Sequence, residues 1–117
     1  MISHVVLMKP RRDLTEAARD ALIAAFARAT RDIPAIQRVT VGRRVRHDAG
    51  YEASAPDAAD YLVVIDFDSV NDLQAYLRHP AHEDLGARFN DSLSAAMVYD
   101  FELVGLDALR AGGLFQS

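Results

Sequence analysis

The stretch that decides the fold is Tyr76-Leu77-Arg78-His79-Pro80-Ala81-His82. A proline has no amide proton and its ring clashes with the preceding turn, so it cannot continue a helix. The sequence therefore predicts that one helix ends near Arg78 and that a second begins at Pro80. Proline suits the first position of a helix, where an amide donor would have no partner. This makes His79 the predicted N-cap and His82 a residue of the first turn.

The direction of the side chains around this break follows from the helical period. At 100° per residue, His82 falls within about 80° of the apolar residues of its helix, which are Leu85, Phe89 and Leu93. His82 should therefore face the interior. In the preceding helix, Tyr76 lies at the margin of an apolar stripe formed by Val70, Leu73 and Leu77. We predict that Tyr76 and His82 converge on one cavity across the break.

Two interpretations of this pair remain open. An imidazole in the first turn lies at the positive end of the helix dipole, which favours the neutral ring. A neutral ring can accept a proton, as a general base must at neutral pH. Alternatively, a histidine and a tyrosine at the edge of a core can be packed and hydrogen-bonded for purely structural reasons.

Length and composition limit the protein class. The chain has 117 residues, half of them apolar, which suits a single domain. It has no cysteine, so disulfides, thiolate nucleophiles and cysteine zinc sites are excluded. The net charge of −4, with mixed signs, argues against nucleic acid or an anionic membrane as a partner. No stretch approaches the roughly 18 apolar residues of a membrane span. We expect a cytoplasmic protein.

The remaining elements follow from periodicity and capping. Alternating patterns predict strands over residues 2–8, 36–45, 60–68 and 95–104, and helical patterns predict helices over residues 14–32, 69–78 and 80–94. Asp13 with Glu16, and Ser69 with Asp72, have the spacing of capping boxes. Residues 48–59 are expected to form a long loop. Residues 1–104 form the predicted domain, and residues 105–117 form a tail.

The strand faces indicate where a site would lie. In the first strand His4, Val6 and Met8 share one face, so His4 is either a packed residue or a site residue. Asp66 and Asp68 also share a face, but a metal site normally needs three or more ligands. We predict no metal there.

The order strand, helix, strand, strand, broken helix, strand predicts an α+β fold of the ferredoxin-like βαββαβ type. Such a fold has a four-stranded antiparallel sheet with helices on one face. Both faces of the first strand are apolar, so the uncovered face needs a partner, and a second copy is the simplest one. We predict a homodimer that forms through the open sheet face.

The sequence also resembles a known family, the stress-responsive A/B barrel or dimeric α/β barrel (Dabb) proteins. The resemblance covers about residues 2–103 and rests on five elements: His4-Val5-Val6-Leu7-Met8-Lys9, the strand around Gly42, Asp66-Phe67-Asp68-Ser69, the stretch from Tyr76 to His82, and Tyr99-Asp100-Phe101. It implies that two protomers pair into a dimeric α/β barrel. Each protomer would hold an apolar cavity between its sheet and its helices.

The resemblance also implies a chemistry. Some plant members are cofactor-free polyketide cyclases, and their catalytic Tyr and His match Tyr76 and His82, while the strand histidine of the family matches His4. The implied ligand is a small apolar or aromatic carbonyl compound. The implied cavity wall consists of Val6, Met8, Leu22, Ile23, Phe26, Val63, Leu93 and Val98. Two alternatives remain: a non-catalytic ligand-binding or stress-protective dimer, and a cofactor-free monooxygenase.

Overall fold

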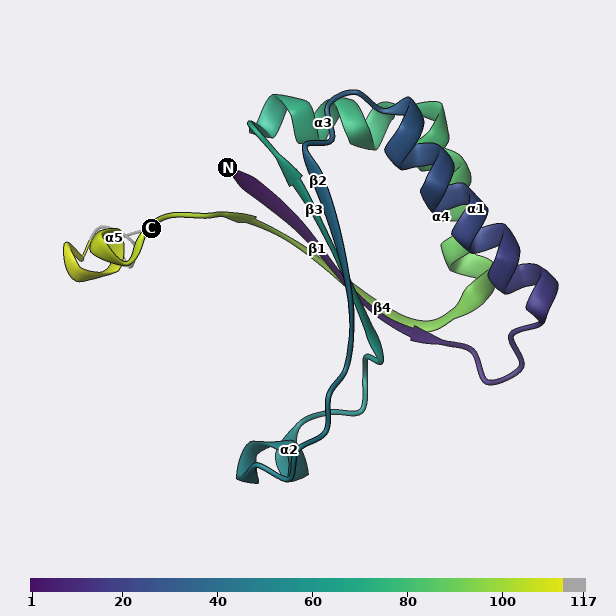
Figure 1. The fold of residues 1–117 in the computed structure, drawn as a ribbon, viewed down its shortest axis with the longest axis horizontal. Coiled ribbons are helices and arrows are strands. Elements are labelled where there is room, and N and C mark those ends of the chain that lie inside the picture. The colour runs from purple at the N-terminus through teal and green to yellow at the C-terminus, as the bar shows by residue number, and fades with distance from the viewer. Residues whose placement is uncertain (113–117) are drawn as a thin grey trace.

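The computed structural model describes residues 1–112 (Figure 1). Its elements alternate as the sequence pattern predicts, with two additional short helices. In chain order they are β1 (Ile2–Pro10), α1 (Glu16–Asp32), β2 (Arg38–Arg43), α2 (Gly50–Ser54), β3 (Tyr61–Phe67), α3 (Val70–Arg78), α4 (Pro80–Ser92), β4 (Leu93–Glu102) and α5 (Leu106–Arg110).

The strands form one antiparallel sheet in the order β2-β3-β1-β4. Figure 1 shows α1, α3 and α4 on one side of this sheet. The predicted ferredoxin-like architecture is therefore confirmed. In the register, His4 pairs with Ile65 of β3 and with Asp100 of β4. Because paired residues of neighbouring strands share a face, these three side chains lie on the side of the sheet that carries the helices.

The core lies between the sheet and α3 and α4. Its fully buried side chains include Tyr76, Phe67, Ile65, Leu85 and Val63. Helix α1 packs mainly against α4 rather than against the strands. This arrangement leaves space between α1 and the sheet.

The break between α3 and α4 occurs where the sequence predicts it. The Nδ1 atom of His79 accepts a hydrogen bond from the amide of Ala81 at 3.0 Å, so His79 is the N-cap of α4. Ser69 caps α3 by accepting from the amide of Asp72. The first helix differs from the expectation. Its cap is Thr15, which accepts from the amide of Ala18, and it begins two residues later than predicted.

Other boundaries also differ. Strand β2 is shorter than the predicted range 36–45, and β4 begins and ends two residues earlier than predicted. The predicted loop 48–59 contains α2, and the predicted tail contains α5. Both helices have five residues, too few for a helical period to be recognised. Leu114 and Phe115 of the predicted tail lie outside the described residues.

Ion pairs connect the segment that carries α2 to the sheet. The carboxylate of Asp57 lies 2.9 Å from Lys9 Nζ, 3.5 Å from Arg44 and 3.6 Å from Arg46. The hydrogen bond and charge of Lys9 lower the pKa of Asp57, and the two arginines add to this effect. Two of the arginines around β2 therefore pair with a neighbouring carboxylate.

None of the helices within residues 1–112 combines the length and apolarity that crossing a membrane requires. The same residues contain no group of three or more histidine and carboxylate side chains placed to hold a metal ion. Asp66, one of the two aspartates weighed as metal ligands, accepts a hydrogen bond from the hydroxyl of Ser3.

Candidate functional site

Tyr76 lies at the centre of a cluster that contains all three predicted catalytic residues. Its ring centroid is 4.7 Å from that of His82 and 5.6 Å from that of His4, with edge-to-face geometry in both pairs. Phe67 contacts the same ring from β3, at 5.2 Å. Tyr76 is only 2 % exposed. The break at Pro80 brings the end of α3 and the start of α4 together over β1, which is why residues 4, 76 and 82 meet.

Sequence reasoning missed one residue of this cluster, Asp100. Its Oδ1 atom lies 2.6 Å from Nδ1 of His4. Because a carboxylate can only accept here, Nδ1 of His4 carries a proton and donates it to Asp100. Asp100 is the β4 residue paired with His4, and this pairing depends on strand register. His4 and Asp100 are 96 residues apart in the chain, so no local sequence pattern predicts that their strands pair in this register.

The surroundings of His82 favour its neutral form. Desolvation is the largest effect and lowers the pKa of His82 below its usual value of 6.5, and the nearby charge of His4 acts in the same direction. A hydrogen bond to the backbone of Leu77 and the charge of Glu83 oppose this shift without cancelling it. His82 is therefore unprotonated at neutral pH. It has the protonation state that a general base needs.

Tyr76 is held as a neutral phenol. Burial raises the pKa of Tyr76 from 10.0 to about 12. The hydroxyl is therefore a hydrogen-bond donor at physiological pH and cannot serve as a base. Among the described residues, no hydrogen bond of this hydroxyl to a neighbouring group is present, so it is available to a ligand.

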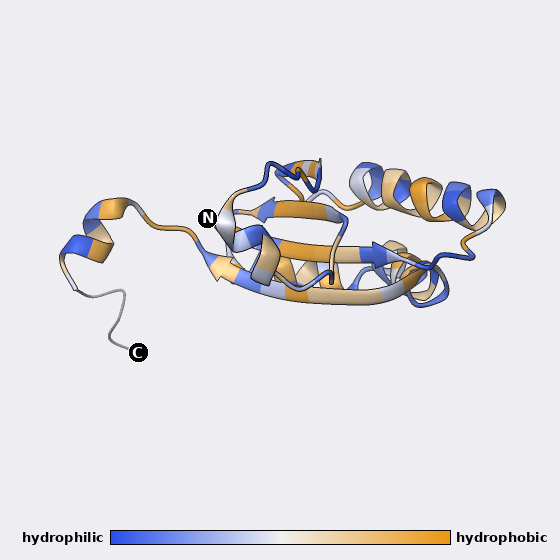
Figure 2. Ribbon diagram, turned by 90° about the horizontal axis from the view of Figure 1, so that it is seen from below, coloured by the Kyte–Doolittle hydropathy of each residue, from blue (hydrophilic) through white to orange (hydrophobic). Residues whose placement is uncertain are grey.

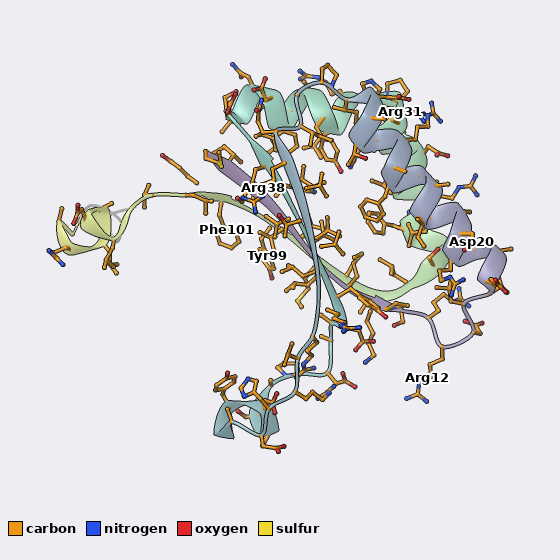
Figure 3. The ribbon with its side chains drawn as sticks, viewed as in Figure 1. Arg12, Asp20, Arg31, Arg38, Tyr99 and Phe101 are labelled. Carbon is orange, nitrogen blue, oxygen red and sulfur yellow. The ribbon has the colours of Figure 1, made fainter. Side chains whose placement is uncertain are left out.

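A large apolar cavity lies beside this cluster, between α1 and the sheet. Its volume is about 1010 Å³. Six of the eight predicted wall residues line it: Met8, Leu22, Ile23, Phe26, Val63 and Leu93. Figure 3 shows the side chains of α1 that project into the gap toward the strands.

The other predicted site residues lie outside this lining. Val6 is buried in the core, and Val98 lies half-exposed on the edge strand β4. His4, Tyr76 and His82 are not among the described residues that line the cavity. Along β1, Val6 separates His4 from Met8, so the cluster and the cavity are neighbours on one face of the sheet. The two predicted parts of the site are therefore adjacent but not continuous.

The lowered pKa of His82 predicts a pH dependence of stability. In the unfolded chain this ring takes up a proton near pH 6.5, whereas in the folded protein it does so only at lower pH. The unfolded state thus binds more protons as the pH falls below 6.5, and stability decreases. The slope from this one group is at most about 1.4 kcal/mol per pH unit.

Urea unfolding between pH 5 and pH 8 measures this effect. We expect the free energy of unfolding of the wild type to fall below pH 6.5 more steeply than that of His82→Gln. Parallel curves for the two proteins would show that the environment of His82 does not favour its neutral form.

The fold and the cluster together define a class. The protein is a ferredoxin-like domain with a His–Tyr cluster between its sheet and its helices. The chain belongs to the Dabb family, the stress responsive A/B barrel domain, whose family model matches residues 2–103. The predicted family resemblance is confirmed.

Relatives and solved structures agree with this assignment. Olivetolic acid cyclase from Cannabis sativa is 23% identical over 100 residues, which is 86% of this chain and 94% of that protein. A dimeric ferredoxin-like protein of unknown function from Thermobifida fusca superposes with a TM-score of 0.67 at 24% identity, covering 87% and 90% of the two chains. The hydroxynitrile lyase of Passiflora edulis superposes with a TM-score of 0.74 at 16% identity, covering 88% and 93%.

Proposed function

We propose that this chain is a cofactor-free enzyme of the cyclase or lyase type that acts on an apolar carbonyl compound. His82 is the general base, Tyr76 is the hydrogen-bond donor, and His4 assists them. The observation that carries the proposal is the direct contact of the Tyr76 and His82 rings, 4.7 Å apart, between a base held neutral and a phenol held protonated. These are the two complementary states that proton abstraction next to a carbonyl requires.

The proposed step conserves atoms and charge. His82 removes a proton from a carbon next to a carbonyl group and becomes an imidazolium. The electron pair of the broken C–H bond moves into the carbonyl group, and the Tyr76 hydroxyl donates a hydrogen bond to the resulting oxyanion. In a cyclase the enolate carbon then attacks a second carbonyl of the same molecule. The proton on His82 returns to the new alkoxide, which regenerates the base.

His4 contributes through its fixed orientation. Its Nδ1–H donates to Asp100, and its ring centroid lies 5.6 Å from that of Tyr76. We propose that Nε2 of His4 forms a hydrogen bond to the substrate or to a bound water. Relatives support the reaction class: a cyclase is 23% identical to this chain, and a lyase shares its fold.

The apolar cavity beside the cluster supports an apolar ligand. Its volume of about 1010 Å³ is at the upper end of typical small-molecule sites, which are about 300–1000 Å³. Aliphatic side chains and Phe26 dominate the wall. We propose that the cavity holds the apolar or aromatic part of a carbonyl compound. Its carbonyl end reaches Tyr76 when the Val6 side chain, which separates the cavity from the cluster, moves aside.

A separate observation supports a second candidate function. The described lining of the cavity does not include His82 or Tyr76. A non-catalytic protein that binds an apolar molecule would need only this cavity, and the cluster would then be part of the core.

One experiment separates the two candidates. The wild-type protein is incubated with a panel of polyketide-like and aromatic carbonyl compounds, with binding followed by thermal shift and turnover by mass change. Binding with turnover supports the enzyme. Binding without turnover of any compound supports the non-catalytic binding protein, and the enzyme proposal then fails.

The assembly is part of the proposal. Structural neighbours from Thermobifida fusca, Bacteroides fragilis and a Jannaschia species are dimeric ferredoxin-like proteins. On the sheet face away from the helices, Tyr99 is 53% and Phe101 is 51% exposed, and Figure 3 shows both on that side. Further apolar residues of this face are Val5, Leu7, Leu62, Val64 and Met97. We propose that two copies pack through this open face.

This predicts the effect of a charge at its centre. Val64→Asp would place a carboxylate between two packed sheets, where an unpaired charge is costly. We expect this variant to be a monomer at micromolar concentration in analytical ultracentrifugation, where the wild type is a dimer. Val70→Asp makes the same change at an exposed position on α3 and should remain dimeric. A dimeric Val64→Asp would contradict the proposed interface.

A further inference from the structure

Residues 103–112 form an arm that projects from the body of the protein. β4 ends at Glu102, and the five-residue helix α5 follows at Leu106–Arg110. Figures 1 and 2 both show this segment extending beyond the end of the sheet. Figure 1 shows it on the side of the sheet opposite to α1, α3 and α4. Residues 104–112 of the arm lie beyond the region 2–103 that the family model matches.

The arm carries apolar side chains that its own chain leaves exposed. Leu106 is 69% exposed, and Leu103, Val104 and Leu109 are exposed as well. An isolated helix of five residues is not stable in water, because helix nucleation costs more than so few hydrogen bonds return. The arm therefore needs a surface to pack on.

The start of the arm is fixed. The amide of Leu103 donates a hydrogen bond to the carbonyl of Met1 at 2.9 Å. This bond continues the β1–β4 pairing, in which Ile2 lies opposite Glu102. The direction in which the arm leaves the sheet is thus set by the sheet itself.

The dimensions of the chain indicate how much surface is left uncovered. The radius of gyration is 16.2 Å, whereas a compact domain of this length has about 13 Å. The accessible surface is 8074 Å², roughly 1800 Å² more than the approximately 6300 Å² expected for a compact monomer of this mass. Obligate homodimers bury about 1000–2500 Å² per protomer. The excess surface therefore matches one side of a homodimer interface.

We infer that the arm docks on a second copy of this chain and holds the two protomers together. The inference rests on the proposed packing through the open face, because a copy seated there lies on the side to which the arm projects. Two-fold symmetry makes the contact reciprocal, so each protomer both gives an arm and receives one. The apolar residues of both arms then become buried.

Shortening the arm tests this inference. A chain that ends at Val104 keeps all four strands and the Leu103–Met1 hydrogen bond. We expect its dimer dissociation constant to rise about tenfold or more, as measured by analytical ultracentrifugation. Leu106→Asp combined with Leu109→Asp keeps the full length and should weaken the dimer in the same direction. The control, Val70→Asp, should leave the dissociation constant unchanged.

Cross-linking identifies the surface that the arm contacts. Because the chain has no cysteine, Leu106→Cys introduces a single attachment point for a photoreactive label. Dimers are then formed from a mixture of ¹⁴N- and ¹⁵N-labelled chains, and the cross-linked peptides are identified by mass spectrometry. Peptides of mixed label arise only between copies. Since chains of the two labels pair at random in an equal mixture, a two-fold dimer is expected to give mixed label in about half of the cross-links.

Two results would overturn the inference: cross-links confined to peptides of one label, which mean that the arm packs on its own chain, or truncated and substituted chains that dimerise as tightly as the wild type. Failure of the open-face interface gives a different pattern. In that case Val64→Asp stays dimeric, whatever the arm variants do.

Discussion

Replacing His82 by alanine is expected to lower turnover about 10²–10⁴-fold while ligand binding is retained. The cavity wall does not include His82, so the apolar part of the ligand keeps its contacts. Tyr76→Phe removes only the hydroxyl and should lower turnover about 10²–10³-fold, as the loss of one oxyanion donor does. The phenylalanine ring can keep the packing against His4 and Phe67.

His79→Ala is the matched control for this prediction. His79 is three residues before His82 and caps α4, and its ring makes no contact with Tyr76 among the aromatic pairs of the described residues. Loss of the cap should cost about 1 kcal/mol of stability. Single-turnover rates of His82→Ala, Tyr76→Phe and His79→Ala are measured with the ligand that the screen identifies. A rate for His82→Ala within a few-fold of the rate for His79→Ala would remove His82 from the mechanism.

The second large effect is a loss of stability when Phe67, which packs against the ring of Tyr76, is replaced. Phe67 is 0% exposed and contacts the Tyr76 ring at 5.2 Å. Phe67→Ala should lower the free energy of unfolding by about 3–5 kcal/mol, because the cavity left behind adds to the lost burial. Most small domains have only about 5–15 kcal/mol in total, so this variant will be close to unfolding.

Urea denaturation measures the change, and Phe67→Leu is the control because it keeps most of the apolar volume and should lose less. If Phe67→Ala were within 1 kcal/mol of the wild type, β3 would not pack on α3 as described.

The helical break and its consequences could be predicted from sequence because their causes are local. Pro80 occupies the start of α4, and the helical period brings His82 toward Tyr76 as predicted. The stripe of α3 differs from the prediction: Tyr76, placed at its margin, is buried with Leu73, whereas Val70 and Leu77 are exposed. Strand alternation likewise placed His4, Val6 and Met8 on one face of β1, and in the structure this face carries the helices. Tyr76 and His82 meet because of these local rules, whereas His4 joins them because α3 packs over β1.

Features that depend on distant pairing were not predictable in the same way. Asp100 meets His4 only because β4 pairs with β1 in one particular register. The separation of the cavity from the cluster depends on how α1 packs against α4 instead of against the sheet. Thr15 rather than Asp13 caps α1, since either side chain has a suitable position and only the backbone path selects one.

The central claim is that His82 removes a proton from carbon, and hydrogen–deuterium exchange tests it most directly. An alkyl aryl ketone that binds the protein is incubated in D₂O, and proton NMR follows loss of the signal from the carbon next to the carbonyl. We predict that the wild type accelerates this exchange, with a rate that falls only below pH 6.5 because the pKa of His82 is lowered. His82→Ala should exchange at the uncatalysed rate. Equal exchange in the wild type and in His82→Ala would contradict the account.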